Sequence, residues 1–116
     1  MNNTQEKTEE EYQIEADAID AMFPDAKFTV SIDIDELDVI VSTEPVIMIK
    51  NTYNCYCYNG CTKKKTEWYS IRGSSITNKY ILNELIRQGL ELECNHRYIE
   101  FFHKINECQF EIATGS

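Results

Sequence analysis

The sequence contains little glycine and little proline, with 4 and 2 residues respectively in a chain of 116. Three glycine-based motifs are absent. They are the phosphate-cradling GxxxxGK loop followed by Ser or Thr, the GxGxxG fingerprint of dinucleotide binding, and the GxSxG turn that presents a nucleophilic serine. Nucleotide-binding and hydrolase functions therefore lack their usual support in this sequence.

Long apolar runs are also missing. A membrane-spanning helix needs roughly 18 consecutive apolar residues, and no stretch approaches that length. The polar N-terminus has no apolar core of the kind that signal peptides carry. We therefore expect a soluble, intracellular protein without membrane contact, and its length suits one domain with its own core.

Basic residues are scarce in the first part of the chain. Residues 1–44 hold 13 acidic and 2 basic residues, whereas residues 45–116 hold 7 acidic and 9 basic residues. An acidic surface repels phosphate backbones, which proteins bind by displacing counterions with Lys and Arg. The composition disfavours nucleic acid as a partner and leaves a basic protein partner open.

Apolar spacing predicts a single α+β domain over residues 8–116, after a disordered tail at residues 1–7. The best-specified element is a helix that Thr77 caps. Gly89 ends it, because glycine adopts the left-handed conformation of a helix stop without strain. One face of this helix is expected to be buried and carries Ile81, Leu82, Leu85 and Ile86.

The remaining elements follow from caps, breakers and alternation. A first helix is predicted to begin with a capping box at Thr8 and Glu11 and to stop near Met22, because Pro24 cannot continue it. An antiparallel sheet of about four strands should follow, with the helices covering one of its faces. The other expected elements are an acidic hairpin with arms 28–34 and 37–42, a strand at 46–50 buried on both faces and continuing to 53, a hairpin with arms 53–58 and 61–72 around Asn59-Gly60, a second C-terminal helix at 96–105 and a final strand at 108–112.

Five cysteines in an intracellular chain favour free thiols or a metal site over a disulfide framework. Cys55 and Cys57 fall on one face of a strand, and Cys61 lies across the expected turn. Cys94 and His96 add two further ligands, so a tetrahedral zinc site is one hypothesis. The one-residue spacing within each pair is unusual for zinc knuckles. Reduced, mostly buried cysteines are therefore the favoured interpretation.

Three further patterns have a functional and a simpler interpretation. Cys94 with His96 or His103 is the local pairing that a cysteine nucleophile would use, but surface histidines are the more common explanation. The lysines at 63–65 beside Trp68 suit nucleic-acid contacts, yet such lysines more often keep an edge strand soluble. The acidic stretch 33–38 lacks the glycine and terminal glutamate of a calcium-binding EF-hand loop, so it is interpreted as a solvated face.

Two stretches resemble known families. Residues 77–116, which include Glu93-Cys94-Asn95-His96-Arg97-Tyr98 and end in Gly115-Ser116, resemble uncharacterised small proteins of giant, mimivirus-type DNA viruses. That resemblance implies a viral protein of the host cytoplasm or the virion and no known activity. Residues 14–25, IEADAIDAMFPD, resemble the opening of RWD domains, which are protein-interaction modules, although the tyrosine-proline turn of that family is absent.

These observations favour a non-enzymatic protein-interaction protein that uses an acidic surface and an aromatic hairpin, without a cofactor. A zinc-binding module and a cysteine-dependent enzyme are the alternatives. The sequence leaves the oligomeric state and the identity of the partner open.

The zinc hypothesis predicts about one zinc ion per purified chain and a lower melting temperature after chelation, because structural zinc contributes folding free energy directly. Elemental analysis and thermal melts with and without EDTA test both points. Metal-free protein whose melting does not respond to the chelator rejects the site.

Overall fold

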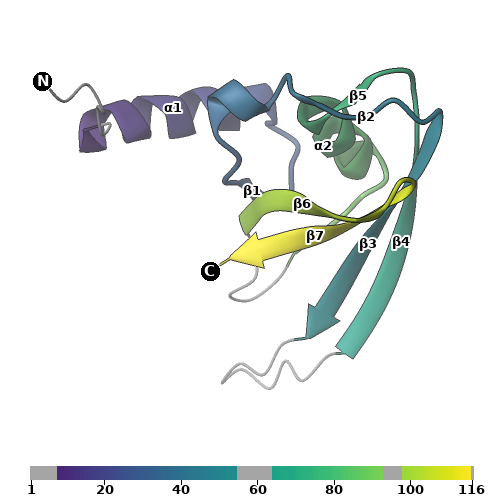
Figure 1. Ribbon diagram of the computed structural model, residues 1–116. Helices are drawn as coiled ribbons and strands as arrows, with labels where there is room; N and C mark the ends of the chain where they lie inside the picture. The colour runs from purple at the N-terminus through teal and green to yellow at the C-terminus, as the bar shows by residue number, and fades with distance from the viewer. Residues whose placement is uncertain (1–7, 55–63, 93–97, 116) are drawn as a thin grey trace, which may run out of the picture.

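The computed structural model describes residues 8–54, 64–92 and 98–115 (Figure 1). These residues contain two α-helices, a five-stranded sheet and a two-stranded sheet, which confirms the α+β class. In chain order the elements are α1 (Glu9–Met22), β1 (Thr29–Val30), the 3₁₀ helix η1 (Ile34–Glu36), β2 (Ile40–Ser42), β3 (Val46–Asn54), β4 (Lys64–Arg72), β5 (Ile76–Thr77), α2 (Asn78–Arg87), β6 (Tyr98–Asn106) and β7 (Gln109–Gly115).

The five-stranded sheet has the order β1-β6-β7-β3-β4 and is mixed. β1 runs parallel to β6, and β7 runs parallel to β3, whereas β6–β7 and β3–β4 are antiparallel hairpins. The predicted four-stranded antiparallel sheet is therefore wrong in detail. The reason is that the late hairpin β6–β7 inserts between β1 and β3. Figure 1 shows the strong twist of the sheet, in which β3 and β4 cross the direction of β6 and β7.

Helix α2 supplies the centre of the core. Thr77 caps it by accepting a hydrogen bond from the Tyr80 N–H at 3.1 Å. The helix stops before Gly89, and the Leu90 N–H returns to the Leu85 carbonyl at 3.0 Å, as in a Schellman motif. The predicted helix is thus confirmed at its start and at its stop. Residues of α2, β3 and β4 that are fully buried in one apolar cluster are Ile81, Leu82, Leu85, Ile47, Ile49 and Ile71.

Helix α1 begins at the predicted capping box of Thr8 and Glu11 and ends at Met22. Ile19 is its only buried residue. Tyr12, which lies two helical turns before Ile19 on the same face, is 57% exposed. Figure 1 shows α1 at one end of the fold, with its N-terminal half projecting beyond the strands of the sheet. Neither helix in the described part of the chain is long and apolar enough to cross a membrane.

Residues 28–42 do not form the predicted hairpin. Phe28, Val30 and Ile32 are buried alternately, as expected. The chain then turns through η1, so that β1 pairs with β6 and β2 pairs with β5. The prediction failed because alternation identifies the buried face of a strand and does not identify its pairing partner.

Residues 98–105 belong to strand β6, and the helix predicted at 96–105 is wrong over them. Ile99 and Phe102 are buried, as the helical prediction required, but Ile105 is 45% exposed. The pairing of β6 with β7 shifts register between Ile99 and Phe101. This irregularity places two residues three apart on the same face and so imitates a helical spacing.

Strand β3 lies inside the sheet between β4 and β7. Ile47 and Ile49 are buried while Val46 is exposed, so the strand is buried on one face and not on both. The predicted hairpin arms are confirmed over residues 53–54 and 64–72, and the pairing of β3 with β4 has no register shift. Its Asn59-Gly60 turn lies outside the described residues. The final strand is confirmed as β7, although Cys108 lies in the turn before it.

We predict that Gly89→Ala lowers the free energy of unfolding by about 1–2 kcal/mol, because Gly89 has φ of +84° and L-residues are strained there. A steric clash is not the cause, since a Cβ at this position meets no atom within 4 Å. Urea denaturation measures the change, and Gly89→Asn should lose less because asparagine tolerates this conformation better. Equal losses for both variants would contradict the explanation.

Candidate functional site

The ligands predicted for zinc all lie outside the described residues: Cys55, Cys57, Cys61, Cys94 and His96. The zinc and cysteine-enzyme hypotheses therefore stay predictions. His103 and Cys108 do lie in the described part, and both are exposed. Within residues 8–54, 64–92 and 98–115, no group of three or more His, Cys, Asp or Glu side chains is placed to hold a metal ion.

Two hollows flank the segment 31–34, which connects β1 to η1. The first has a volume of about 250 Å³ and lies between α1 and this segment, with Tyr12 and Glu15 on its helical wall. The second has a volume of about 310 Å³ and lies toward α2 and β6, with Asn78 and Phe101 among its lining residues. Ser31, Ile32 and Asp33 line both hollows, so the segment forms a shared wall.

The shared wall is held by backbone hydrogen bonds to the core elements. Ser31 donates its N–H to the carbonyl of Ile99 in β6 at 2.8 Å. Beyond η1, the Lys79 N–H of α2 donates to the carbonyl of Leu37 at 2.9 Å, and Leu37 is buried. The Asn78 side chain donates to the Glu36 carbonyl at 2.9 Å. The walls are therefore attached at both ends to the packed part of the fold.

The lining is acidic and aromatic. Its charged side chains are all carboxylates: Glu15, Asp33, Glu36 and Glu100. Each hollow also has one aromatic residue at its wall, and Phe101 is 53% exposed. Four acidic side chains therefore concentrate negative charge around the apolar contacts of this surface. We name it the acidic surface. It agrees with the acidic first half of the sequence, but Glu100 and Phe101 come from β6.

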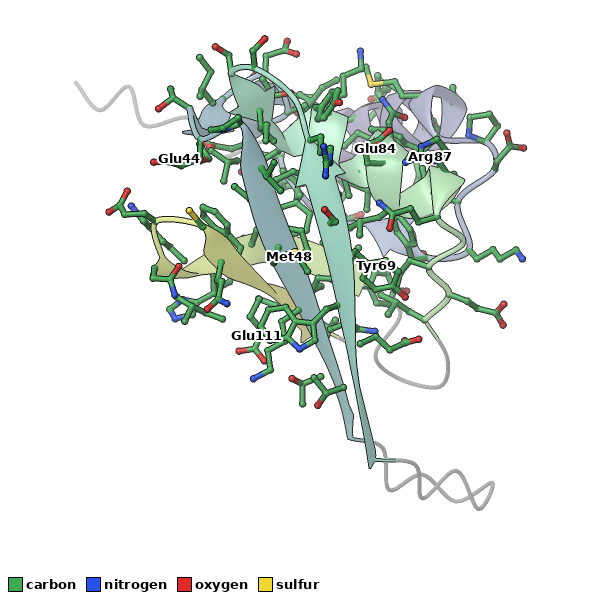
Figure 2. All side chains as sticks on the ribbon, turned by 90° about the vertical axis from the view of Figure 1, so that its right-hand side faces the viewer. Glu44, Met48, Tyr69, Glu84, Arg87 and Glu111 are labelled. Carbon is green, nitrogen blue, oxygen red and sulfur yellow. The ribbon has the colours of Figure 1, made fainter. Side chains whose placement is uncertain are left out.

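The aromatic residues of hairpin β3–β4 divide between its two faces. Tyr69 is half-buried on the core face, and burial raises the pKa of its hydroxyl, with a further increase from the charge of Glu67 and their hydrogen bond. Trp68 is 45% exposed on the opposite face, and the Lys50 Nζ lies 5.7 Å from its ring centroid. Figure 2 shows Tyr69 on the side of the strands where α2 lies and Met48 on the other.

The acidic surface and the hairpin are separate features. The acidic surface is built around β1 and β6, whereas Trp68 lies on β4, at the opposite edge of the five-stranded sheet. The sequence predicted both features and could not place them relative to each other.

One unusual residue was missed by the sequence analysis. Asn51 is 2% exposed on β3, and its side-chain Nδ2 has no hydrogen-bond partner among the described residues. It follows Ile47 and Ile49 at alternate positions, so its burial was detectable from the spacing. Its antiparallel partner is Glu67 of β4. A buried amide nitrogen without a partner is costly, since its N–H groups lose their hydrogen bonds to water and gain none in return.

Comparison of the chain with protein-family models, with curated proteins and with solved structures returned no match. The resemblances to giant-virus proteins and to RWD domains therefore stay predictions.

We predict that Asn51→Val raises the free energy of unfolding by about 1 kcal/mol, because it removes an unpartnered buried amide and places a β-branched residue in a strand. Asn51→Asp should lower it, because a carboxylate would then be buried. Urea denaturation of both variants decides the matter. A loss of stability in Asn51→Val would show that the amide has a partner in solution.

Proposed function

We propose that the protein is a non-enzymatic interaction protein whose acidic surface binds a basic, partly apolar segment of a partner protein. The observation that carries this proposal is the combination of two adjoining hollows, four carboxylates and two exposed aromatic side chains at one edge of the fold. Aromatic side chains are frequent anchors of protein interfaces, and surrounding charges select the partner and accelerate association.

The dimensions of the hollows favour a protein partner over a small ligand. Small-molecule sites are usually enclosed pockets of about 300–1,000 Å³ lined by apolar groups with a few polar ones. The two hollows here, of about 250 and 310 Å³, are at or below the lower end of that range and share one wall. Each has room for side chains of a partner that continues along the surface.

The charge of the lining defines the complementary sequence. A segment that offers Lys or Arg to Asp33, Glu36 and Glu100, and an apolar side chain to Phe101, would meet each lining group with its counterpart. Because these carboxylates lie in solvent-accessible positions, their attraction should weaken as salt rises. The proposed interaction is therefore expected to be salt-sensitive.

A displayed library of random twelve-residue peptides, selected on the full chain, tests the proposal. We expect enrichment of peptides in which Lys or Arg flank aromatic or aliphatic residues. Phe101→Ala should weaken a selected synthetic peptide about tenfold, the loss typical of an interface anchor. The double variant Asp33→Asn, Glu36→Gln should weaken it about three- to tenfold at low salt and less at high salt.

Asp25→Asn is the matched control, since Asp25 is exposed and lines neither hollow. It should leave the peptide affinity within twofold of the unmodified chain. Fluorescence anisotropy gives each dissociation constant. Failure to select any basic peptide, or equal binding of a selected basic peptide to the Asp33→Asn, Glu36→Gln variant, would overturn the proposed function.

A further inference from the structure

Strand β4 is an edge of the five-stranded sheet and is nine residues long. It pairs with β3 along its whole length on one side. On the other side, no strand of the described residues pairs with it. Long edge strands present rows of N–H and C=O groups to which another chain can add, and proteins usually protect them. The backbone groups of β4 that are already occupied therefore determine which part of this edge another chain can bind.

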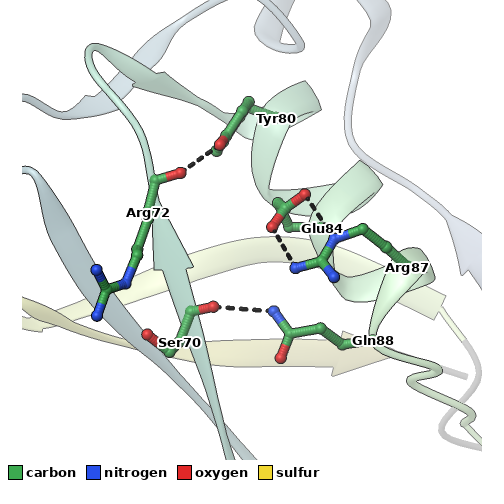
Figure 3. Close-up of polar contacts among 6 residues, drawn as sticks. All are labelled: Ser70, Arg72, Tyr80, Glu84, Arg87 and Gln88. Atoms are coloured by element: carbon green, nitrogen blue, oxygen red, sulfur yellow. Dashed lines mark hydrogen bonds and ion pairs between the residues drawn. The ribbon is translucent and has the colours of Figure 1, made fainter.

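Helix α2 protects one half of the edge. The Gln88 side chain donates to the Ser70 carbonyl at 2.9 Å, and the Tyr80 hydroxyl donates to the Arg72 carbonyl (Figure 3). The Tyr80 ring lies so close to Gly73 that a Cβ there would come within 2.9 Å of it. Tyr80 of α2 and Gln88, the residue directly after the helix, thus occupy the outward carbonyls near the end of β4.

The same contacts define the direction of the other backbone groups. In an antiparallel ladder, both backbone groups of a residue point to the same side, and the side alternates along the strand. Since the carbonyls of Ser70 and Arg72 point away from β3, those of Thr66 and Trp68 also point outward, together with their N–H groups. Among the described residues, no backbone group bonds to either position from outside. We name residues 66–68 the open half of the edge.

We infer that the open half of β4 binds an extended acidic segment of a partner protein, which adds to the sheet as a sixth strand. Extended peptides bind exposed sheet edges in this way, with affinity from main-chain hydrogen bonds and selectivity from side chains beside the strand. This site lies at the opposite edge from the acidic surface and does not rest on the function proposed for that surface.

The charges near the open half favour an acidic occupant. Lys50 of β3 lies beside Trp68 on the face of the hairpin opposite the core. Strand β4 itself begins with Lys64 and Lys65. Glu67 is the one acidic residue of β4, and it forms a hydrogen bond with the Tyr69 hydroxyl. A carboxylate on the incoming strand opposite the first residues of β4, and an apolar residue opposite Trp68, would each form a favourable cross-strand pair.

A second copy of the chain is a less suitable occupant. In a β4–β4 pair the incoming strand would itself begin with Lys64 and Lys65 and carry only one acidic residue, so it lacks the acidic character that this edge favours. Extension of a β4–β4 pair is also limited, because Gln88 already occupies the carbonyl of Ser70. Self-association is nevertheless a distinct outcome of the test below.

Thr66→Pro tests the inference with little disturbance of the fold. The N–H of Thr66 points outward, so proline removes a group that the partner strand needs and spares the pairing with β3. Thr66→Ala is the matched control, because it keeps the N–H. Gln88→Ala acts in the other direction, since it frees the Ser70 carbonyl and lengthens the open edge.

The probe is a decapeptide selected on the full chain from a random display library, with its affinity measured by fluorescence anisotropy. We expect selected peptides that are acidic, extended and free of proline at their centre. Thr66→Pro should weaken the peptide at least tenfold and Thr66→Ala less than twofold, whereas Gln88→Ala should strengthen it about two- to threefold. Exchange of the Trp68 amide hydrogen should slow on binding, and this readout does not depend on the stability of any variant.

Three results would overturn the inference. The first is that no acidic peptide is selected, and the second is that Thr66→Pro, shown by thermal melting to be folded, binds as tightly as the unmodified chain. The third is a dimer of the chain that Thr66→Pro dissociates, since this would assign the edge to a second copy. Selection of basic peptides sensitive to Asp33→Asn and insensitive to Thr66→Pro would support the acidic surface and reject the edge.

Discussion

The packing of α2 on the core face of β3 and β4 is the contact on which the acidic surface and the open edge of β4 both depend. The helix buries Ile81, Leu82 and Leu85 fully in the cluster that contains Ile47 and Ile71, and Ile86 packs partly buried against it. Its first turn then holds the chain after η1 through the N–H of Lys79, and the residue after its last turn reaches the β4 edge through Gln88. One helix therefore positions the wall of the acidic surface and limits the length of the open edge. A change that displaced α2 would alter both surfaces together.

The features predictable from the sequence were those with local determinants. The cap at Thr77 and the stop at Gly89 involve atoms within a few residues of each other, and the structure contains both. The capping box of α1 and the pairing of β3 with β4 have the same local character. The errors arose where distant parts of the chain meet. Residues 98–105 were assigned to a helix because a register shift against β7 produced a spacing of three, and β1 received the wrong partner because β6 follows it by about seventy residues.

The candidate site shows the same division. Acidic composition and an exposed aromatic hairpin followed from the sequence, as did the lysines of β4. The hollows could not be predicted from the sequence. They form because β6 brings Glu100 and Phe101 beside the segment 31–34, which also lies next to α1. The outward direction of Thr66 and Trp68 also needed structure, since only the contacts of Gln88 and Tyr80 reveal which carbonyls point away from β3. Patterns in sequence supplied the chemistry of each surface, and tertiary contacts supplied its shape.

The far half of hairpin β3–β4, around residues 51 and 67, has two unusual features. One is a buried side-chain nitrogen without a hydrogen-bond partner, and the other is an edge to which no strand of the described residues pairs. Asn51 is buried with an unpartnered amide nitrogen, and its cross-strand partner Glu67 lies between Thr66 and Trp68 on the open half of the edge. The other edge strand, β1, is only two residues long and offers little to an added chain. Costly features persist where the rest of a fold is stable enough to tolerate them, and they often gather at functional sites. The unpartnered nitrogen and the open edge lie at neighbouring positions of the strands, and this favours the binding of a partner protein at this half of the hairpin. Binding at this edge would rest mainly on backbone hydrogen bonds, with the lysines selecting the partner, whereas binding at the acidic surface would rest mainly on charge, so salt should weaken binding at the acidic surface more.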